Sequence, residues 1–216
     1  MIILDSVTKS YRVKDVEKRI LDDVSFEFPA GQNIAIMGHN GAGKSTLMRM
    51  VAGIELPTAG IIRRDEKVSW PLGFASGFNG LMTGTENVRF VARIYGEDSD
   101  QVLDHVKAFA ELGKSIDLPI ETYSSGMKAR LAFGLSLAID FDCYLIDEIT
   151  AVGDRRFKER SSAALNDKIK NARVLMISHA EKTIRDYCQM GVLLYGAQLY
   201  YYDSVNALIK DYRRFC

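Results

Sequence analysis

The sequence predicts an α/β protein, in which strands with parallel pairing form a sheet and helices join them. Apolar runs of strand length recur in the first and last thirds of the chain, and most are followed by a helical pattern. A glycine-rich segment stands directly between one apolar run and the helical pattern after it. The middle third carries only helical patterns, so a helical insert is expected to interrupt the sheet.

The first third predicts strands, one helix and a turn. Apolar residues favour strands over residues 2–7, 24–28 and 33–37. The glycine-rich loop follows, and a helix is expected over residues 44–52. The Pro and Gly of LPTAG (56–60) indicate a turn, with short strands at 61–63 and 68–70.

The middle third has the spacing of amphipathic helices. Val102, Val106 and Phe109 recur at intervals of three or four and define one apolar side. Helices are expected over residues 85–95, 99–112 and 125–139.

The last third alternates again. Strands are expected at 143–146, 173–177, 192–195 and 199–202, and helices at 155–168, 180–187 and 204–212. We therefore expect one domain, with a core of about residues 1–79 and 136–216 and a helical subdomain of about residues 80–135.

Composition excludes several classes of protein. The 216 residues are 47% hydrophobic, which excludes a disordered chain. Lys plus Arg and Asp plus Glu both number 28, so no charge excess favours nucleic acid as a partner. Three widely spaced cysteines form no disulfide or zinc pattern and indicate a reducing compartment. The chain shows neither a signal peptide nor an apolar run of membrane-spanning length. We expect it to be soluble by itself and to meet a membrane only through a partner.

The glycine-rich segment matches the phosphate-loop pattern G-x-x-x-x-G-K-[ST], formed here by Gly38, His39, Asn40, Gly41, Ala42, Gly43, Lys44 and Ser45. Glycines let several backbone N–H groups point at one anion, and the following helix adds positive potential. Lys44 can reach the β- and γ-phosphates, Ser45 can ligate Mg²⁺, and Thr46 can approach the α-phosphate. A plain surface turn is the alternative, and the strand–loop–helix context favours phosphate binding.

Two carboxylates end the apolar strand Cys-Tyr-Leu-Ile at Asp147 and Glu148. Buried charge is costly without a cation or a chemical task. Asp147 suits the shell of Mg²⁺, and Glu148 suits a general base for the attacking water. Alone, such a pair is more often a solvated strand end, but the phosphate loop reverses that preference. His179 follows another strand and is expected at the same sheet edge, within reach of a γ-phosphate.

Two further features remain ambiguous from local pattern. A predicted helix begins with small and polar residues at Ser124, Ser125, Gly126 and Met127. This helix N-terminus is either an anion-binding site or an ordinary helix capped by Ser, and the local pattern favours the cap. Tyr11 follows a short strand, where it can either stack on a base or pack.

Taken together and in order, these motifs resemble the ATP-binding cassette (ABC) ATPase family, from about Ile2 to Ala207. The resemblance implies a mixed central sheet flanked by helices, an antiparallel β part at the N-terminus and a helical subdomain. It implies that Tyr11 stacks on adenine, that residues 124–127 are the signature sequence and that Asp154 is the dimer-contact aspartate. It also assigns Asp147 to Mg²⁺, Glu148 to catalysis and His179 to the γ-phosphate switch.

This sequence departs from the family at two places. The family's Gln before the helical insert is expected near Phe74, where the chain has no Gln. Ser125 and Met127 replace Gly and Gln in the signature. Segments 70–73, 77–80, 82–87 and 123–127 nevertheless resemble the ATPase subunits of Gram-negative capsular polysaccharide exporters. O-antigen exporters share much of the pattern, but commonly add a carbohydrate-binding domain after it, and teichoic-acid exporters are a further alternative.

The resemblance implies an ATP- and Mg²⁺-dependent ATP hydrolase on the cytoplasmic face of the inner membrane. Its expected partners are a second copy of the chain, which sandwiches ATP, and a membrane-spanning permease. We expect the permease contact at residues 73–87, because Phe74, Phe78, Leu81 and Met82 follow no strand or helix period. The alternative is that these side chains fill the core of the subdomain. The polysaccharide would be handled by the complex and not by this chain. A soluble ABC ATPase acting on DNA or ribosomes, and an inactive nucleotide-binding regulator, are the remaining alternatives.

Overall fold

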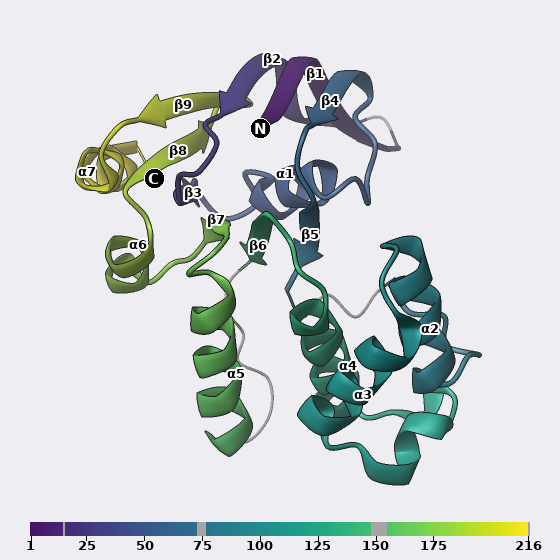
Figure 1. The fold of residues 1–216 in the computed structure, drawn as a ribbon. Coiled ribbons are helices and arrows are strands. Elements are labelled where there is room, and N and C mark those ends of the chain that lie inside the picture. Colours follow the sequence, from purple (N-terminus) through teal and green to yellow (C-terminus); the bar gives the residue numbers. More distant parts are fainter. Residues whose placement is uncertain (15, 73–76, 148–154, 216) are drawn as a thin grey trace. The chain divides into compact units, whose positions relative to one another are not determined.

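The computed structural model describes residues 1–14, 16–72, 77–147 and 155–215. The chain divides into two compact units (Figure 1). Unit 1 comprises Met1–Pro71, Phe141–Ile149 and Ala172–Cys216, and unit 2 comprises Leu72–Asp140 and Thr150–Asn171.

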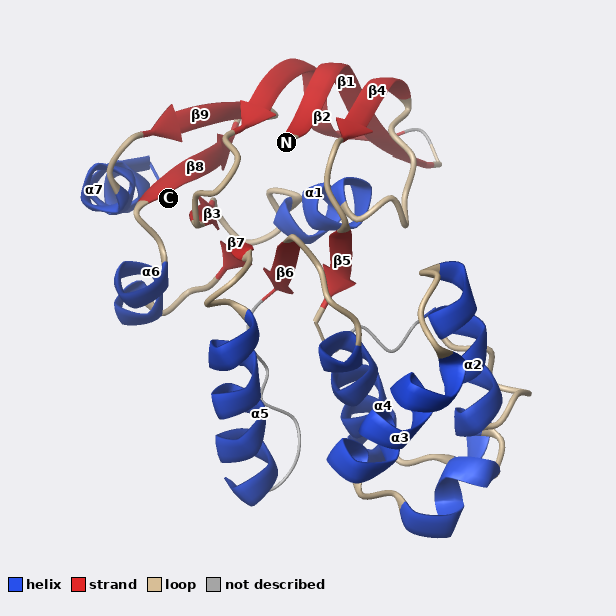
Figure 2. Ribbon diagram, viewed as in Figure 1, coloured by secondary structure: helices blue, strands red, loops and turns tan. Residues whose placement is uncertain are grey.

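Unit 1 contains two sheets (Figure 2). The first is antiparallel in the order β2-β1-β4 and the second has the order β5-β6-β7-β3-β8-β9. In the second, all neighbouring strands are parallel except β9, which is antiparallel to β8. The strand bounds are β1 Ile2–Val13, β2 Val16–Phe28, β3 Ile34–Met37, β4 Ala59–Arg64, β5 Val68–Pro71, β6 Cys143–Asp147, β7 Arg173–Ile177, β8 Met190–Tyr195 and β9 Gln198–Tyr202.

The core of unit 1 lies where helix α1 (Lys44–Val51) meets the strands. Leu47 and Met48 of α1 are fully buried, together with Ile34 and Ile36 of β3. Strands β3 and β7 are buried along their whole length, because neighbouring strands and helices cover them. Two further helices complete the unit, α6 (Glu181–Tyr187) and α7 (Val205–Phe215).

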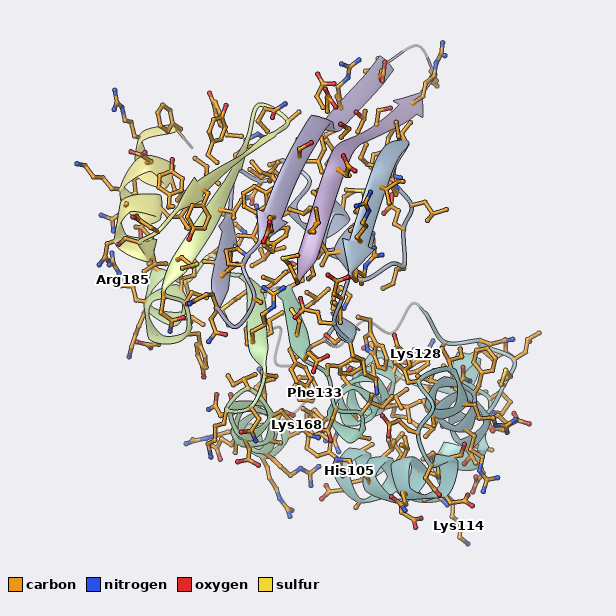
Figure 3. All side chains as sticks on the ribbon, turned by 45° about the horizontal axis from the view of Figure 1, so that its top comes forward. His105, Lys114, Lys128, Phe133, Lys168 and Arg185 are labelled. Atoms are coloured by element: carbon orange, nitrogen blue, oxygen red, sulfur yellow. The ribbon has the colours of Figure 1, made fainter. Side chains whose placement is uncertain are left out.

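Unit 2 is helical, with α2 Gly84–Ile94, α3 Ser99–Ala110, α4 Ser125–Ala138, α5 Arg155–Lys168 and the 3₁₀ turns η2 Gly113–Asp117 and η3 Ile120–Thr122. Helix α2 begins with a capping box, in which Thr83 and Glu86 satisfy each other's backbone N–H groups. An aromatic cluster holds α5 to its neighbours: the Phe157 ring lies 5.5 Å from Phe109 of α3 and 6.4 Å from Phe133 of α4. Figure 3 draws these side chains and labels Phe133.

The predicted α/β class, mixed sheet and antiparallel N-terminal part are confirmed. Most expected elements appear within a residue or two of their predicted bounds, and α5 and β7 match at both ends. Strands β1 and β2 are longer than expected, because residues 8–13 and 16–23 extend the hairpin with mainly polar side chains. Helix α5 was expected with the core, but it groups with unit 2 because Phe157 packs into that unit's aromatic cluster.

Within the described residues, no helix combines the length and apolar character needed to cross a membrane.

Candidate functional site

The strand order of unit 1 brings three candidate segments to one edge of the larger sheet. Strand β7 lies between β6 and β3, and Ile177 at its end pairs with both Asp147 of β6 and Ile36 of β3. The loop 38–43 leaves β3, and His179 follows β7 by two residues. These parallel strands therefore present Asp147, the loop and His179 at their carboxyl ends, where α/β sheets bind ligands.

Two glycines of the loop leave no room for a side chain. A Cβ at Gly38 would stand 2.5 Å from the carbonyl oxygen of Leu194 on β8. Gly43 has a φ of 106°, in the left-handed region, and its Cβ would overlap Ile20 of β2. The loop therefore packs tightly against β2 and β8, and α1 starts with its N-terminus facing the same edge.

The side chain of Lys44 is folded back over the loop. Its ammonium donates hydrogen bonds to the carbonyl oxygens of Gly38, at 2.7 Å, and His39, at 3.1 Å. Lys44 is only 9% exposed, so its charge is held close to the start of α1. An anion at this position would meet the ammonium and the helix N-terminus together.

A cavity of about 390 Å³ opens at this edge. It gathers nine of the candidate residues predicted from sequence: Tyr11, Asn40, Gly41, Gly43, Lys44, Ser45, Thr46, Asp147 and His179. Gly38, His39 and Ala42 belong to the loop but are not among the lining residues. Every described lining residue comes from unit 1.

Sequence reasoning missed three residues of the cavity wall, Lys18, Ile20 and Ile177. Lys18 stands directly opposite Tyr11 in the β1–β2 pair, so both side chains emerge on the same face of the hairpin. A Cβ at Gly41 would lie 3.6 Å from the Lys18 ammonium, which places this cation beside the loop. The polar hairpin sequence carried no phosphate-binding pattern, and only the strand register reveals the residue.

The signature residues 124–127 lie at the start of α4 in unit 2. Ser124 is the N-cap, because its Oγ accepts a hydrogen bond of 3.2 Å from the backbone N–H of Met127. The cap interpretation of the sequence is thus confirmed. Ser124 and Ser125 are both exposed, so they are accessible to a ligand outside the subunit.

Two predicted site residues, Glu148 and Asp154, and the position near Phe74, lie outside the described residues. Their expected roles therefore stay predictions.

The site can hold a polyanion together with a divalent cation. Two lysines and a helix N-terminus supply positive charge, while the Ser45 hydroxyl and the Asp147 carboxylate supply oxygen ligands at the same cavity. Oxygen ligands are the ones that Mg²⁺ prefers, so these two residues fit that ion. Fold and site together define a phosphate-loop nucleotide-binding domain.

Comparisons with known proteins narrow this class. The family model "ABC transporter" matches residues 21–151. The polysialic acid transport ATP-binding protein KpsT of Escherichia coli is 46% identical, over 99% of both chains. The capsule polysaccharide export ATP-binding protein CtrD of Neisseria meningitidis serogroup B is 43% identical, over 98% of both. The chain therefore belongs to the ABC transporter family, and the resemblance to capsular polysaccharide export ATPases is confirmed.

A solved structure shares the fold. It is the dimeric post-hydrolysis state of the ATP-binding cassette MJ0796 bound to ADP and Pi, with a TM-score of 0.73 and 21% identity. The similarity covers 95% of this chain and 99% of that one. It confirms the ABC-type cassette fold expected from the motifs.

Proposed function

We propose that the chain hydrolyses ATP to drive export of a capsular polysaccharide across the inner membrane. The single observation that carries the chemistry is the cavity, in which Lys44, Ser45, Asp147 and His179 converge from three separate segments. The polymer class is supported by relatives that match this chain over nearly their whole length.

Each residue has a defined task in this proposal. The loop N–H groups and Lys44 hold the phosphates, and Thr46 donates to the α-phosphate. His179 contacts the γ-phosphate, and Glu148 acts as general base on the attacking water. Ser45 and Asp147 would hold Mg²⁺, which supplies charge neutralisation to the phosphates when it is bound.

A second copy of the chain completes the site. Ser124 and Ser125 are exposed at the start of α4 in unit 2, where the signature of a second copy would be accessible to a nucleotide. We place the signature of one copy against the nucleotide of the other, with Asp154 at the contact. ATP is then the element that joins the two copies, and its hydrolysis releases them.

A membrane-spanning permease binds unit 2, on the cytoplasmic face of the membrane. Four large apolar side chains of this unit are more than half exposed: Leu81, Phe90, Ile94 and Leu118. Phe90 and Ile94 are four residues apart on α2, and so share one face. The adjacent exposed side chains of Phe90 and Ile94 favour a protein contact on this face of α2. Leu81 lies in the segment 73–87 expected to bind the permease. Phe78 is half-buried, which makes it a poorer probe.

Two experiments test the proposal. Glu148→Gln should bind ATP without hydrolysing it and sediment as a dimer with ATP and as a monomer without it. A monomer at saturating ATP would contradict the composite site.

The permease contact is tested by Phe90→Asp, with Val16→Asp as the matched control. Val16 is 69% exposed and lies on the β1–β2 hairpin of unit 1. Phe90→Asp should keep ATP hydrolysis by the isolated chain and lose both permease co-purification and export. Val16→Asp should keep all three, and equal losses in the two variants would contradict the contact.

A further inference from the structure

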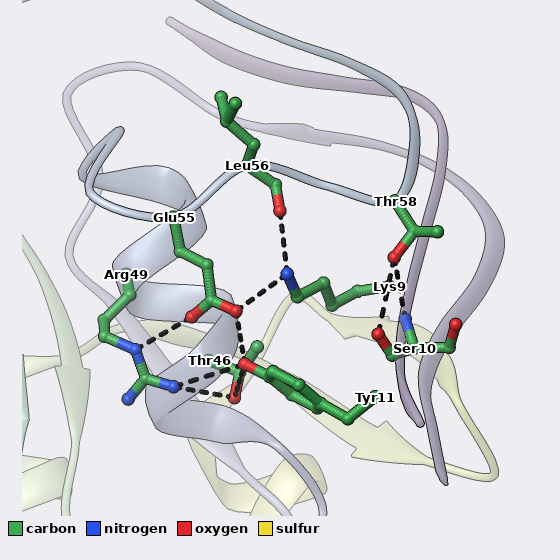
Figure 4. A network of polar contacts seen from close by, with 8 residues as sticks. All are labelled: Lys9, Ser10, Tyr11, Thr46, Arg49, Glu55, Leu56 and Thr58. Carbon is green, nitrogen blue, oxygen red and sulfur yellow. Dashed lines mark hydrogen bonds and ion pairs between the residues drawn. The ribbon is translucent and has the colours of Figure 1, made fainter. Parts of the chain in front are cut away.

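A polar cluster, called here the Glu55 cluster and drawn in Figure 4, shares two residues with the lining of the cavity. It consists of Lys9, Tyr11, Thr46, Arg49 and Glu55. Only Tyr11 and Thr46 of these line the cavity. The other three are connected to the site through hydrogen bonds and ion pairs within the cluster.

The carboxylate of Glu55 is the centre of the cluster. It accepts hydrogen bonds from Lys9 Nζ at 2.7 Å, from Arg49 Nε at 2.9 Å and from the Tyr11 hydroxyl. Partial burial, which by itself raises the pKa of Glu55, is outweighed by these hydrogen bonds, so the pKa falls to about 2. Glu55 is therefore ionised at neutral pH and acts only as an acceptor.

The cluster fixes the ring of Tyr11 from two directions. Its hydroxyl is tied to Glu55, and the Lys9 ammonium lies 4.9 Å from the ring centroid, over one face. Lys9 is itself anchored, because Nζ also donates to the Leu56 carbonyl oxygen at 2.8 Å. Since the Lys9 ammonium occupies one face of the ring, a base that stacks on Tyr11 needs the other face.

The strand alone does not supply this restraint. The β1–β4 pairing ends at Thr8, so at Tyr11 the strand β1 pairs only with β2. The half-buried ring packs against the core of unit 1, and its hydroxyl also lies 3.4 Å from Thr46 Oγ1 and 3.5 Å from Arg49 Nη2. The charged acceptor Glu55 makes the strongest of these three contacts on the hydroxyl.

We propose that Glu55 is a positioning residue for the nucleotide base: it holds the Tyr11 ring, through the hydroxyl and the Lys9 ammonium, in the orientation that lets adenine stack on its free face. This inference rests on the proposed role of Tyr11. It gives a role to a residue outside every motif of the sequence.

The test uses ADP and inorganic pyrophosphate, titrated into the full chain by calorimetry. Pyrophosphate has no base, so it reports on the phosphate loop alone. Glu55→Gln should raise the Kd for ADP roughly fivefold, about the net effect of losing one ordinary hydrogen bond, because the tether acts on the base only through Tyr11. The Kd for pyrophosphate should stay unchanged or fall, because the substitution removes a negative charge near an anion site.

A double-substitution cycle identifies the route of the effect. Tyr11→Phe keeps the ring and loses only the tethered hydroxyl, so it should weaken ADP binding by a similar factor. The combined variant should be no weaker than either single variant, because both changes break the same tether. Glu27→Gln is the charge-matched control, since Glu27 is exposed on β2 outside the cluster, and it should change neither Kd.

Three results would overturn the inference. ADP and pyrophosphate could weaken equally, which would point to general damage of the site. The two substitutions could add independently, or Glu55→Gln could leave ADP binding unchanged. If Tyr11→Ala also leaves ADP binding unchanged, the base does not stack on Tyr11 and the assignment of that residue fails with it. Loss of pyrophosphate binding in Lys44→Ala tests the phosphate loop separately.

Discussion

Replacing Arg173 with Met should destabilise unit 1 by about 3 kcal/mol. Arg173 begins β7 and is almost completely buried, with 2% of its side chain exposed, against 10% for its partner Glu66. The guanidinium donates from Nε to Glu66 Oε2 at 3.0 Å, from Nη2 to Glu66 Oε1, and from Nη1 to the Pro29 carbonyl oxygen at 2.8 Å. Removing it leaves the Glu66 carboxylate buried without its main partner.

The magnitude follows from this arrangement. Breaking a buried ion pair on one side costs about 3–5 kcal/mol, mostly because the remaining charge is uncompensated. The N-terminal ammonium lies 3.4 Å from Glu66 and retains part of the compensation, so the lower end of the range applies. Replacing both Arg173 and Glu66 with Met removes both charges and should lie within about 1–2 kcal/mol of the unsubstituted chain.

The assay is urea unfolding at pH 7, followed by the fluorescence of the single tryptophan. Trp70 belongs to unit 1, and its ring centroid is 5.4 Å from that of Phe141, so its emission reports on this unit. The reasoning would be refuted if Arg173→Met cost less than about 1 kcal/mol. It would be refuted equally if the double variant were as unstable as the single one.

Three further changes are expected to have measurable effects. Gly43→Ala should weaken ADP binding at least roughly tenfold in a calorimetric titration, because the left-handed φ of 106° and the overlap with Ile20 would displace the loop; unchanged binding would contradict the tight loop packing. Lys18→Ala should weaken pyrophosphate binding without altering thermal stability, since the ammonium is exposed beside the loop; an unchanged Kd in the same titration would remove Lys18 from the site. Burial and then the Lys168 ammonium lower the pKa of His105, with Asp140 opposing, so the unfolded chain binds a proton more readily. The free energy of unfolding should therefore fall as pH drops below 6.5. In circular dichroism melts, the stability of His105→Asn should lack this part of the pH dependence.

The pattern of apolar residues along the chain was sufficient to predict most of the helices and strands. Strand β7 could be bounded correctly because four apolar residues follow Arg173 without interruption. In helix α5 the buried positions Phe157, Ser161 and Leu165 are spaced by four residues, as in a helix with one side covered. The β1–β2 hairpin was underestimated because its outer half, including Lys9 and Lys18, alternates mainly between polar residues. Pairing between the two strands in that half depends on the tertiary structure, so the sequence shows no alternation of apolar and polar residues that would predict it.

The same distinction applies to the site. Lys44 and Ser45 could be assigned from sequence, because all the phosphate-binding groups of the loop belong to one contiguous motif. Lys18 and Glu55 could not, because each reaches the site through a cross-strand register or a side-chain contact between distant segments. The grouping of helix α5 with unit 2 was not visible in the sequence for a similar reason, since the contacts of Phe157 join segments that are distant along the chain.

The most direct test of the account is export by cells that carry Lys44→Ala in place of the native chain. Capsular polysaccharide would be quantified on the surface and inside the cells, with the permease co-purified to show that the complex still assembles. We expect assembly to be retained, surface polymer to be lost and polymer to accumulate inside. Normal surface polymer in this variant, produced at the native level, would contradict the claim that ATP bound at this cavity drives export.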